Sequence, residues 1–110
     1  MLQAKCVKIK LKPESIPRVR AWAAEVNRRR DEALTTMRDE DVVVEAAFLL
    51  RSSEGDSLIY FMKGRDMKAQ TNAAAALVHP IDAYHQQFKR DTWQSVEELE
   101  PLIDLDRLSE

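Results

Sequence analysis

The feature that most constrains the fold is a predicted β-hairpin that is apolar on both faces. Residues 42–52 and 58–65 are rich in β-branched and aromatic side chains, and the segment between them, around Gly55, is typical of a hairpin turn. In the first of these strands Val42, Val44, Ala46, Phe48 and Leu50 lie on one face and Val43, Ala47 and Leu49 on the other. In the second, Leu58, Tyr60 and Met62 lie on one face and Ile59 and Phe61 on the other. A sheet built on this hairpin therefore needs cover on both faces.

The remaining elements predicted around this hairpin are two strands and two helices. Alternation of lysine with apolar residues indicates a strand, and apolar residues at helical spacing indicate helices. These elements are a strand over residues 5–12, a helix from residue 16 to residue 39, a helix over residues 67–78 and a final strand over residues 99–105. Their order, β-α-β-β-α-β, is that of the ferredoxin-like fold. The prediction is one α+β domain over residues 1–110, with an antiparallel sheet and helices on one face.

Charge is unevenly distributed along the chain, although the net charge is only −2. Lysines gather in the first predicted strand, and carboxylates gather near the C-terminus. Because the first and last strands of this fold are neighbours, the opposite charges can pair across the sheet. The asymmetry therefore has a structural explanation, and no nucleic-acid partner is predicted.

Several features bear on location and partners. No segment approaches the roughly 20 apolar residues that span a membrane, and the first ten residues lack the apolar core of a signal peptide. A lone cysteine, Cys6, suits a reducing compartment. We therefore expect a cytoplasmic protein with no membrane partner. Because the second sheet face is also apolar, we predict a homodimer that buries it. The alternative is a C-terminal segment that folds back over this face.

The most chemically suggestive segment is V-H-P-I-D-A-Y-H, residues 78–85, which contains both histidines. Pro80 ends the preceding helix and suits the first turn of another. That helix has one apolar face, formed by Ile81, Tyr84, His85 and Phe88. Two interpretations stay open for His85. Asp82, three residues before it, orients it as a general base facing a cavity, beside the Tyr84 hydroxyl; or His85 is hydrogen-bonded within the packed fold.

Two polar residues on the predicted hairpin are further candidates. Glu45 lies on an otherwise apolar strand face, so it either pairs with a structural partner such as Lys8 or Lys10 or lines a ligand cavity. Tyr60 lies on the other strand of the hairpin. The candidate ligand-binding residues are His85, Asp82, Tyr84, Tyr60 and Glu45.

No metal site and no cofactor are predicted. His79 and His85 are separated by a helix break, and neither cysteine nor paired carboxylates complete a ligand set. The sequence also has no glycine-rich phosphate loop, no serine nucleophile elbow and no C-x-x-C motif. Catalytic residues are not assigned, and whether the protein is an enzyme stays open.

The sequence resembles a family of small bacterial proteins known as a domain of unknown function. The resemblance is carried by K-I-K-L-K-P-E-S-I-P-R-V-R-A-W, F-L-L, Y-F-M-K and H-P-I-D-A-Y-H-Q-Q-F, in this order, over residues 5–88. It implies a ferredoxin-like domain similar to the dimeric α+β barrel group. That group includes cofactor-free monooxygenases, haem-degrading enzymes and stress-induced barrel proteins, but the resemblance implies no particular reaction.

Two function classes follow from these patterns. The first is a homodimer that binds a small organic ligand between sheet and helices, near His85. The second is a structural or regulatory interaction protein without catalysis or ligand, in which the same polar groups are satisfied internally.

Overall fold

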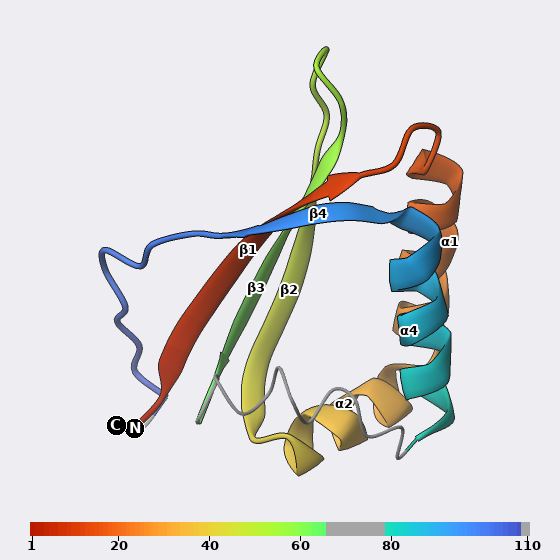
Figure 1. Cartoon of the computed structure of the whole chain (residues 1–110). Helices are drawn as coiled ribbons and strands as arrows, with labels where there is room; N and C mark the ends of the chain where they lie inside the picture. Colours follow the sequence, from red (N-terminus) through yellow and green to blue (C-terminus); the bar gives the residue numbers. More distant parts are fainter. Residues whose placement is uncertain (66–78, 109–110) are drawn as a thin grey trace.

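One antiparallel sheet organises the computed structural model, which describes residues 1–65 and 79–108 (Figure 1). Its strands are β1 (Gln3–Leu11), β2 (Val42–Leu50), β3 (Ser57–Gly64) and β4 (Trp93–Glu98). Their spatial order is β2-β3-β1-β4. The hairpin β2–β3 and the adjacency of the first and last strands are therefore as predicted.

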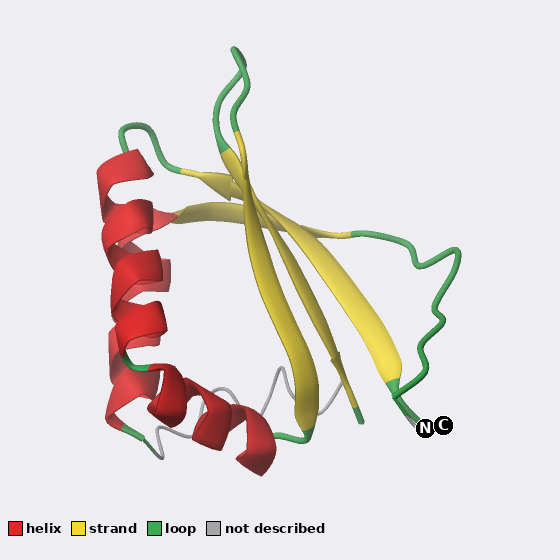
Figure 2. Ribbon diagram, turned by 180° about the vertical axis from the view of Figure 1, so that it is seen from behind, coloured by secondary structure: helices red, strands yellow, loops and turns green. Residues whose placement is uncertain are grey.

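The described helices lie on one face of this sheet (Figure 2). They are α1 (Ile16–Arg28), α2 (Arg30–Asp39) and α4 (Pro80–Thr92). Helices α1 and α4 stand side by side, and α2 runs at a steep angle below them towards β2 (Figure 1). The order β-α-α-β-β-α-β is a ferredoxin-like α+β plan with its first helix divided. The helix predicted over residues 67–78 lies outside the described residues.

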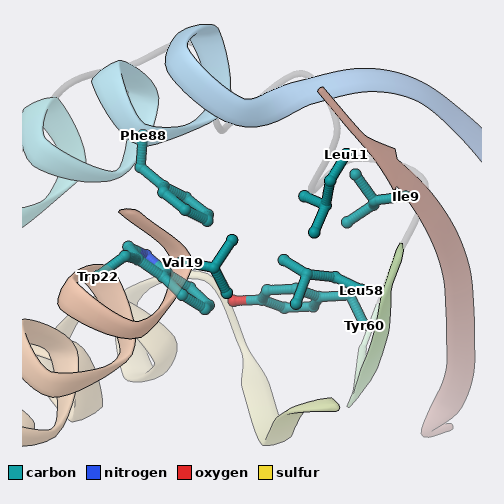
Figure 3. Close-up of a cluster of buried hydrophobic side chains, with 7 residues drawn as sticks. All are labelled: Ile9, Leu11, Val19, Trp22, Leu58, Tyr60 and Phe88. Atoms are coloured by element: carbon teal, nitrogen blue, oxygen red, sulfur yellow. The ribbon is translucent and has the colours of Figure 1, made fainter. Parts of the chain in front are cut away.

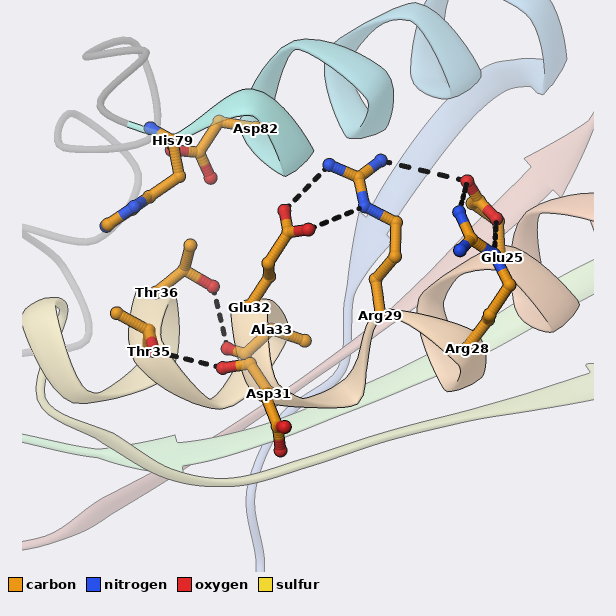
Figure 4. A network of polar contacts seen from close by, with 10 residues as sticks. All are labelled: Glu25, Arg28, Arg29, Asp31, Glu32, Ala33, Thr35, Thr36, His79 and Asp82. Carbon is orange, nitrogen blue, oxygen red and sulfur yellow. Dashed lines mark hydrogen bonds and ion pairs between the residues drawn. The ribbon is translucent and has the colours of Figure 1, made fainter.

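The division of the first helix was not predicted. At Arg29 the backbone leaves helical geometry, with φ −99° and ψ 38°. The Arg29 guanidinium binds Glu32 through two hydrogen bonds of 3.2 and 2.7 Å and lies 3.8 Å from Glu25 (Figure 4). Arg29 therefore bridges the last turn of α1 and the first turn of α2. Helix-forming residues continue through this region, so the periodicity of the sequence does not reveal the break at Arg29.

The hydrophobic core lies between the sheet and the helices (Figure 3). It comprises Ile9, Leu11, Val19, Trp22, Leu58, Tyr60 and Phe88. The Trp22 and Phe88 rings stack with centroids 4.4 Å apart and planes within 4°. Burial of each large side chain contributes about 1.5–3 kcal/mol to the stability of the fold, so these contacts hold α1 and α4 against the sheet.

The final strand lies earlier than residues 99–105, where it was predicted. Strand β4 follows α4 directly and pairs with β1, placing Glu97 opposite Lys8. After β4 the Leu99 N–H donates to the Cys6 carbonyl at 2.9 Å, and the chain then leaves the sheet as an irregular tail. Pro101 lacks the N–H that a strand in this position would donate to β1.

The sheet face opposite the helices carries an open apolar area on β2 and β3. Phe48 is 61% exposed and Leu50 43% exposed, and they share this face with half-buried Ile59 and Phe61. The C-terminal tail reaches this face at Lys63, which lies 2.5 Å from Asp104 and 2.6 Å from Asp106. The tail thus covers Lys63 and leaves Phe48 and Leu50 in solvent.

Candidate functional site

A cavity of about 370 Å³ lies between the sheet and the helices. Its apolar walls include Val7, Trp22, Val26, Met62, Ile81, Trp93 and Val96. Its polar lining comprises Lys5, Thr36, Glu40, Glu45, Tyr60, Asp82, His85, Gln86 and Lys89. The volume lies within the range of about 300–1,000 Å³ that is typical of small-molecule sites, and the lining combines apolar walls with many polar and charged groups.

The structure brings four of the five candidate residues to this cavity. They are Glu45, Tyr60, Asp82 and His85. Tyr84, on α4, instead packs against α1. Its hydroxyl lies 3.3 Å from an Arg18 guanidinium nitrogen that donates to it, and the same guanidinium lies 5.2 Å from the ring centroid. Tyr84 therefore contributes to helix packing in this arrangement.

His85 is held in one tautomer by a tryptophan. Nε1 of Trp22 donates to Nδ1 of His85 at 3.1 Å. Because an indole N–H can only donate, Nδ1 is the unprotonated nitrogen, and the proton of the neutral imidazole lies on Nε2. Burial, with a contribution from the charge of Lys89, lowers the pKa of His85 to about 4. At neutral pH His85 is therefore a neutral hydrogen-bond donor through Nε2. Of the two interpretations left open for His85, the general base is the one that this state does not favour.

Asp82 binds the start of α4, whereas the general-base interpretation required it to orient His85. Its carboxylate accepts a hydrogen bond of 2.9 Å from the backbone N–H of His79, at the start of α4. This contact satisfies a free helix N–H and places a negative charge at the positive end of the helix dipole. The His79 ring in turn lies 2.6 Å from Asp39 at the end of α2. Asp82 and His79 thus form a junction between two helices, and Asp82 also borders the cavity.

Glu45 and Tyr60 form a pair on the sheet side of the cavity. The Tyr60 hydroxyl donates to Oε2 of Glu45 at 2.5 Å. Burial raises the pKa of Glu45, although the hydrogen bond from Tyr60 opposes this effect. Burial, reinforced by the charge of Glu45, raises the pKa of Tyr60 well above its ordinary value, so Tyr60 stays the donor. Of the two alternatives for Glu45, pairing with Lys8 or Lys10 is wrong, because both lysines lie on the opposite face of the sheet from buried Ile9.

Charged residues that sequence reasoning did not single out complete the cavity. Lys89 lies one helical turn after His85, and burial lowers its pKa while Glu45 and Glu40 oppose that shift. Burial raises the pKa of Glu40, and the charges of Asp82 and Glu45 add to this. The spacing of Lys89 from His85 was a usable signal. The place of Glu40 depends on how α2 approaches the sheet, which the sequence pattern does not reveal.

The described part of the chain has neither a metal-binding cluster nor a membrane-spanning helix. Within residues 1–65 and 79–108, no group of three or more His, Cys, Asp or Glu side chains is placed to hold a metal ion. Within the same ranges, no helix combines the length and apolar character that crossing a bilayer requires.

The strand order and the helices define a ferredoxin-like α+β protein, and comparisons with known proteins agree with this fold. The chain belongs to a family of unknown function, DUF6176, whose model matches residues 2–110. A search of curated proteins finds no match to the chain.

Two solved structures share the fold. A Bacteroides thetaiotaomicron protein assigned as an antibiotic biosynthesis monooxygenase is 17% identical, with a TM-score of 0.57 over 98% of this chain and 96% of that one. The Mycobacterium tuberculosis protein Rv0793 is 19% identical, with a TM-score of 0.54 over 96% of this chain and 100% of that one. At these identities the likeness concerns the fold, and it assigns no activity to this chain.

Proposed function

We propose that this protein is a single-domain cytoplasmic homodimer that binds a small organic ligand between its sheet and its helices. The observation that carries the binding role is the cavity of about 370 Å³, with His85 on its helix side and the Glu45–Tyr60 pair on its sheet side. The apolar walls suit the body of an organic molecule, and the polar groups can fix its orientation.

A thermal-shift screen with a metabolite library tests the binding role. A ligand of the cavity should raise the melting temperature of the wild type, because it binds the folded state alone. Ala33 lines the cavity, so Ala33→Phe should occupy part of the volume and reduce the shift. Glu54→Gln, in the exposed hairpin turn, is the matched control and should keep the full shift.

His85→Gln separates this function from the alternative of an interaction protein without a ligand. If His85 serves binding, the variant should keep nearly the wild-type melting temperature and lose the ligand-induced shift. A large loss of stability, together with no ligand effect in any variant, would favour the alternative. The internal hydrogen bond from Trp22 to His85 supports this alternative, because it gives His85 a structural partner.

The homodimer is proposed from the open sheet face. Phe48 and Leu50 are 61% and 43% exposed beside Ile59 and Phe61, and a second copy of the same face would bury them. Sedimentation at micromolar concentration should show a dimer, and Phe48→Lys should shift it to monomer. Leu34→Lys is the control, since Leu34 is 38% exposed on α2, away from this face. A monomeric wild type would contradict the proposal.

The proposed cytoplasmic location is supported by Cys6, which is a free thiol, as is usual in reducing compartments. Cell fractionation of the native protein tests it, and recovery outside the cytoplasm would contradict it.

A further inference from the structure

We propose that the cavity removes a proton from a carbon atom adjacent to a carbonyl group, with Glu45 as the base and the Nε2–H of His85 as the donor to the carbonyl oxygen. This inference rests on the proposed ligand-binding role of the cavity and adds a reaction class to it. The ligand is then a largely apolar ketone or related carbon acid.

The base lies on the sheet side of the cavity. Tyr60 donates to Oε2 of Glu45, which leaves Oε1 to receive a proton, since no described residue donates to that oxygen. Tyr60 is thereby a positioning residue, because its short hydrogen bond restricts the orientation of the carboxylate. Burial raises the pKa of Glu45, which moves this carboxylate towards the basicity useful at neutral pH.

The donor comes from the helix side. Trp22 engages Nδ1 of His85, so the imidazole presents Nε2–H as its remaining hydrogen-bonding group. The His85 ring lies 6.3 Å from the Tyr60 ring, between centroids, and both rings border the cavity. The base and the donor therefore lie on the sheet side and the helix side of one cavity, which Trp22 also lines. A donor held in a fixed position stabilises an oxyanion as it forms.

Among the remaining charges of the cavity lining, the lysines favour such a step and the carboxylates oppose it. Lys89 and Lys5 contribute positive charge to the cavity lining, and Glu40 and Asp82 contribute negative charge. Burial lowers the pKa of Lys89, and the carboxylates of Glu45 and Glu40 oppose this shift. A nearby cation favours the negative charge of an enolate as it forms.

The proposed step balances without a further reagent. The carbon–hydrogen bond breaks and its proton moves to Oε1 of Glu45. The electron pair of that bond forms a carbon–carbon double bond, and the carbonyl π pair moves to the oxygen, which accepts the hydrogen bond from Nε2–H of His85. Return of the proton to the same carbon regenerates the ketone, and return to another carbon of a conjugated enolate gives an isomer.

Exchange of carbon-bound hydrogen with solvent tests this step directly. The probe is 1-tetralone, a bicyclic aromatic ketone, in buffered D₂O with purified wild-type protein. Proton NMR follows loss of the signal from the methylene group beside the carbonyl, relative to buffer alone. We expect the wild type to accelerate the exchange, and Glu45→Gln to reduce the acceleration by at least about 100-fold, as is usual for loss of a general base.

Companion variants distinguish catalysis from structure. His85→Phe removes the donor and should reduce the rate by about 100-fold or more, in line with loss of an oxyanion donor. Tyr60→Phe keeps the base and should change the pH dependence of exchange, because it alters the pKa of Glu45. Glu54→Gln should exchange at the wild-type rate. Glu45→Asp keeps a carboxylate, so partial activity is expected if Glu45→Gln does not fold.

Binding is measured in parallel by the quenching of tryptophan fluorescence, since Trp22 and Trp93 both line the cavity. Binding of 1-tetralone without accelerated exchange would overturn the proton-transfer step and leave the binding role intact. Acceleration that persists in Glu45→Gln would overturn the assignment of the base. If neither 1-tetralone nor any metabolite of the thermal-shift screen binds, the proposed function itself fails.

Discussion

Trp22 donates its indole N–H to Nδ1 of His85 across 3.1 Å while its ring stacks on Phe88 at 4.4 Å. One side chain of α1 thus packs the core and determines which nitrogen of the cavity histidine carries a proton. Because of this contact, His85 is a hydrogen-bond donor at Nε2 and is not available as a base at neutral pH.

The tautomer is the first prediction. In the wild type at pH 7, the side-chain ¹⁵N chemical shifts of His85 should show a protonated Nε2 and an unprotonated Nδ1. Trp22→Phe removes the indole donor and keeps an aromatic ring against Phe88, so both tautomers should then be populated. An unchanged tautomer in Trp22→Phe would show that another group fixes the ring. His79, whose ring contacts Asp39, is an internal reference in the same spectrum.

The pH dependence of stability is the second prediction. The pKa of His85 is lowered from 6.5 to about 4 in the folded protein, so between these values the unfolded state binds a proton that the folded state does not. Stability must then fall as the pH falls through this window. The contribution of His85 should decrease by about 3 kcal/mol between pH 7 and pH 4, at about 1.4 kcal/mol per unit of pKa difference.

The measurement compares urea unfolding of the wild type and His85→Gln across this pH range. The difference in unfolding free energy isolates His85, which is necessary because the raised pKa values of Glu40 and Glu45 act in the opposite direction. A difference that does not change with pH would show that His85 titrates normally in the folded protein.

The third prediction concerns the Glu45–Tyr60 pair. Tyr60→Phe removes the donor to Oε2 and leaves the carboxylate without it, which should lower the unfolding free energy by about 1 kcal/mol at pH 7. The pKa of Glu45 should rise further, because the Tyr60 hydrogen bond lowers it. The variant should therefore regain part of the lost stability as the pH falls and Glu45 takes up a proton.

Glu45→Gln is the matched variant, because its amide oxygen can still accept from Tyr60 without a charge in the cavity. We expect a stability within about 1 kcal/mol of the wild type. Urea unfolding at pH 7 and pH 5 distinguishes the two variants. Equal losses in Tyr60→Phe at both pH values would contradict a pKa that depends on this hydrogen bond.

Much of the fold follows from local sequence patterns. Alternation of apolar residues identified β1, β2 and β3, and Pro80 identified the start of α4, because strand faces and helix termini depend on neighbouring residues. The pairing of Lys8 with Glu97 agrees with the charge asymmetry of the chain. The last strand was misplaced because residues 99–105 are more apolar than β4. In the structure Leu102, Ile103 and Leu105 are 80–85% exposed.

The candidate site was predicted less completely than the fold. Glu45 and Tyr60 could be recognised as polar positions on apolar strands, and His85 as a polar position on an apolar helix face. Their true partners could not be recognised. Trp22 donates a hydrogen bond to His85 across 63 residues of sequence, so this contact depends on how α1 and α4 pack. Asp82 accepts from the N–H of His79, so this contact depends on where α4 begins.

The last prediction concerns Lys63, which is 4% exposed and holds the C-terminal tail. Its Nζ lies 2.5 Å from Asp104 and 2.6 Å from Asp106, and Asp104 also accepts from the Ala4 N–H at 2.9 Å. Lys63→Met should release the tail, because a buried cation that joined two carboxylates to β3 is lost. Trypsin should then cleave after Arg107 several times faster than in the wild type, as followed by mass spectrometry.

The control is Lys10→Met, which removes an exposed lysine from β1 and should leave the cleavage rate unchanged. Lys63 lowers the pKa of both Asp104 and Asp106, so their contribution to holding the tail is present at neutral pH and is lost as the pH falls through the lowered pKa values. Hydrogen exchange of the Ala4 amide should therefore show less protection, relative to the intrinsic rate, in acid than at pH 7. Wild-type cleavage rates in Lys63→Met would show that the tail is held by its other contacts, such as the Leu99 hydrogen bond to Cys6.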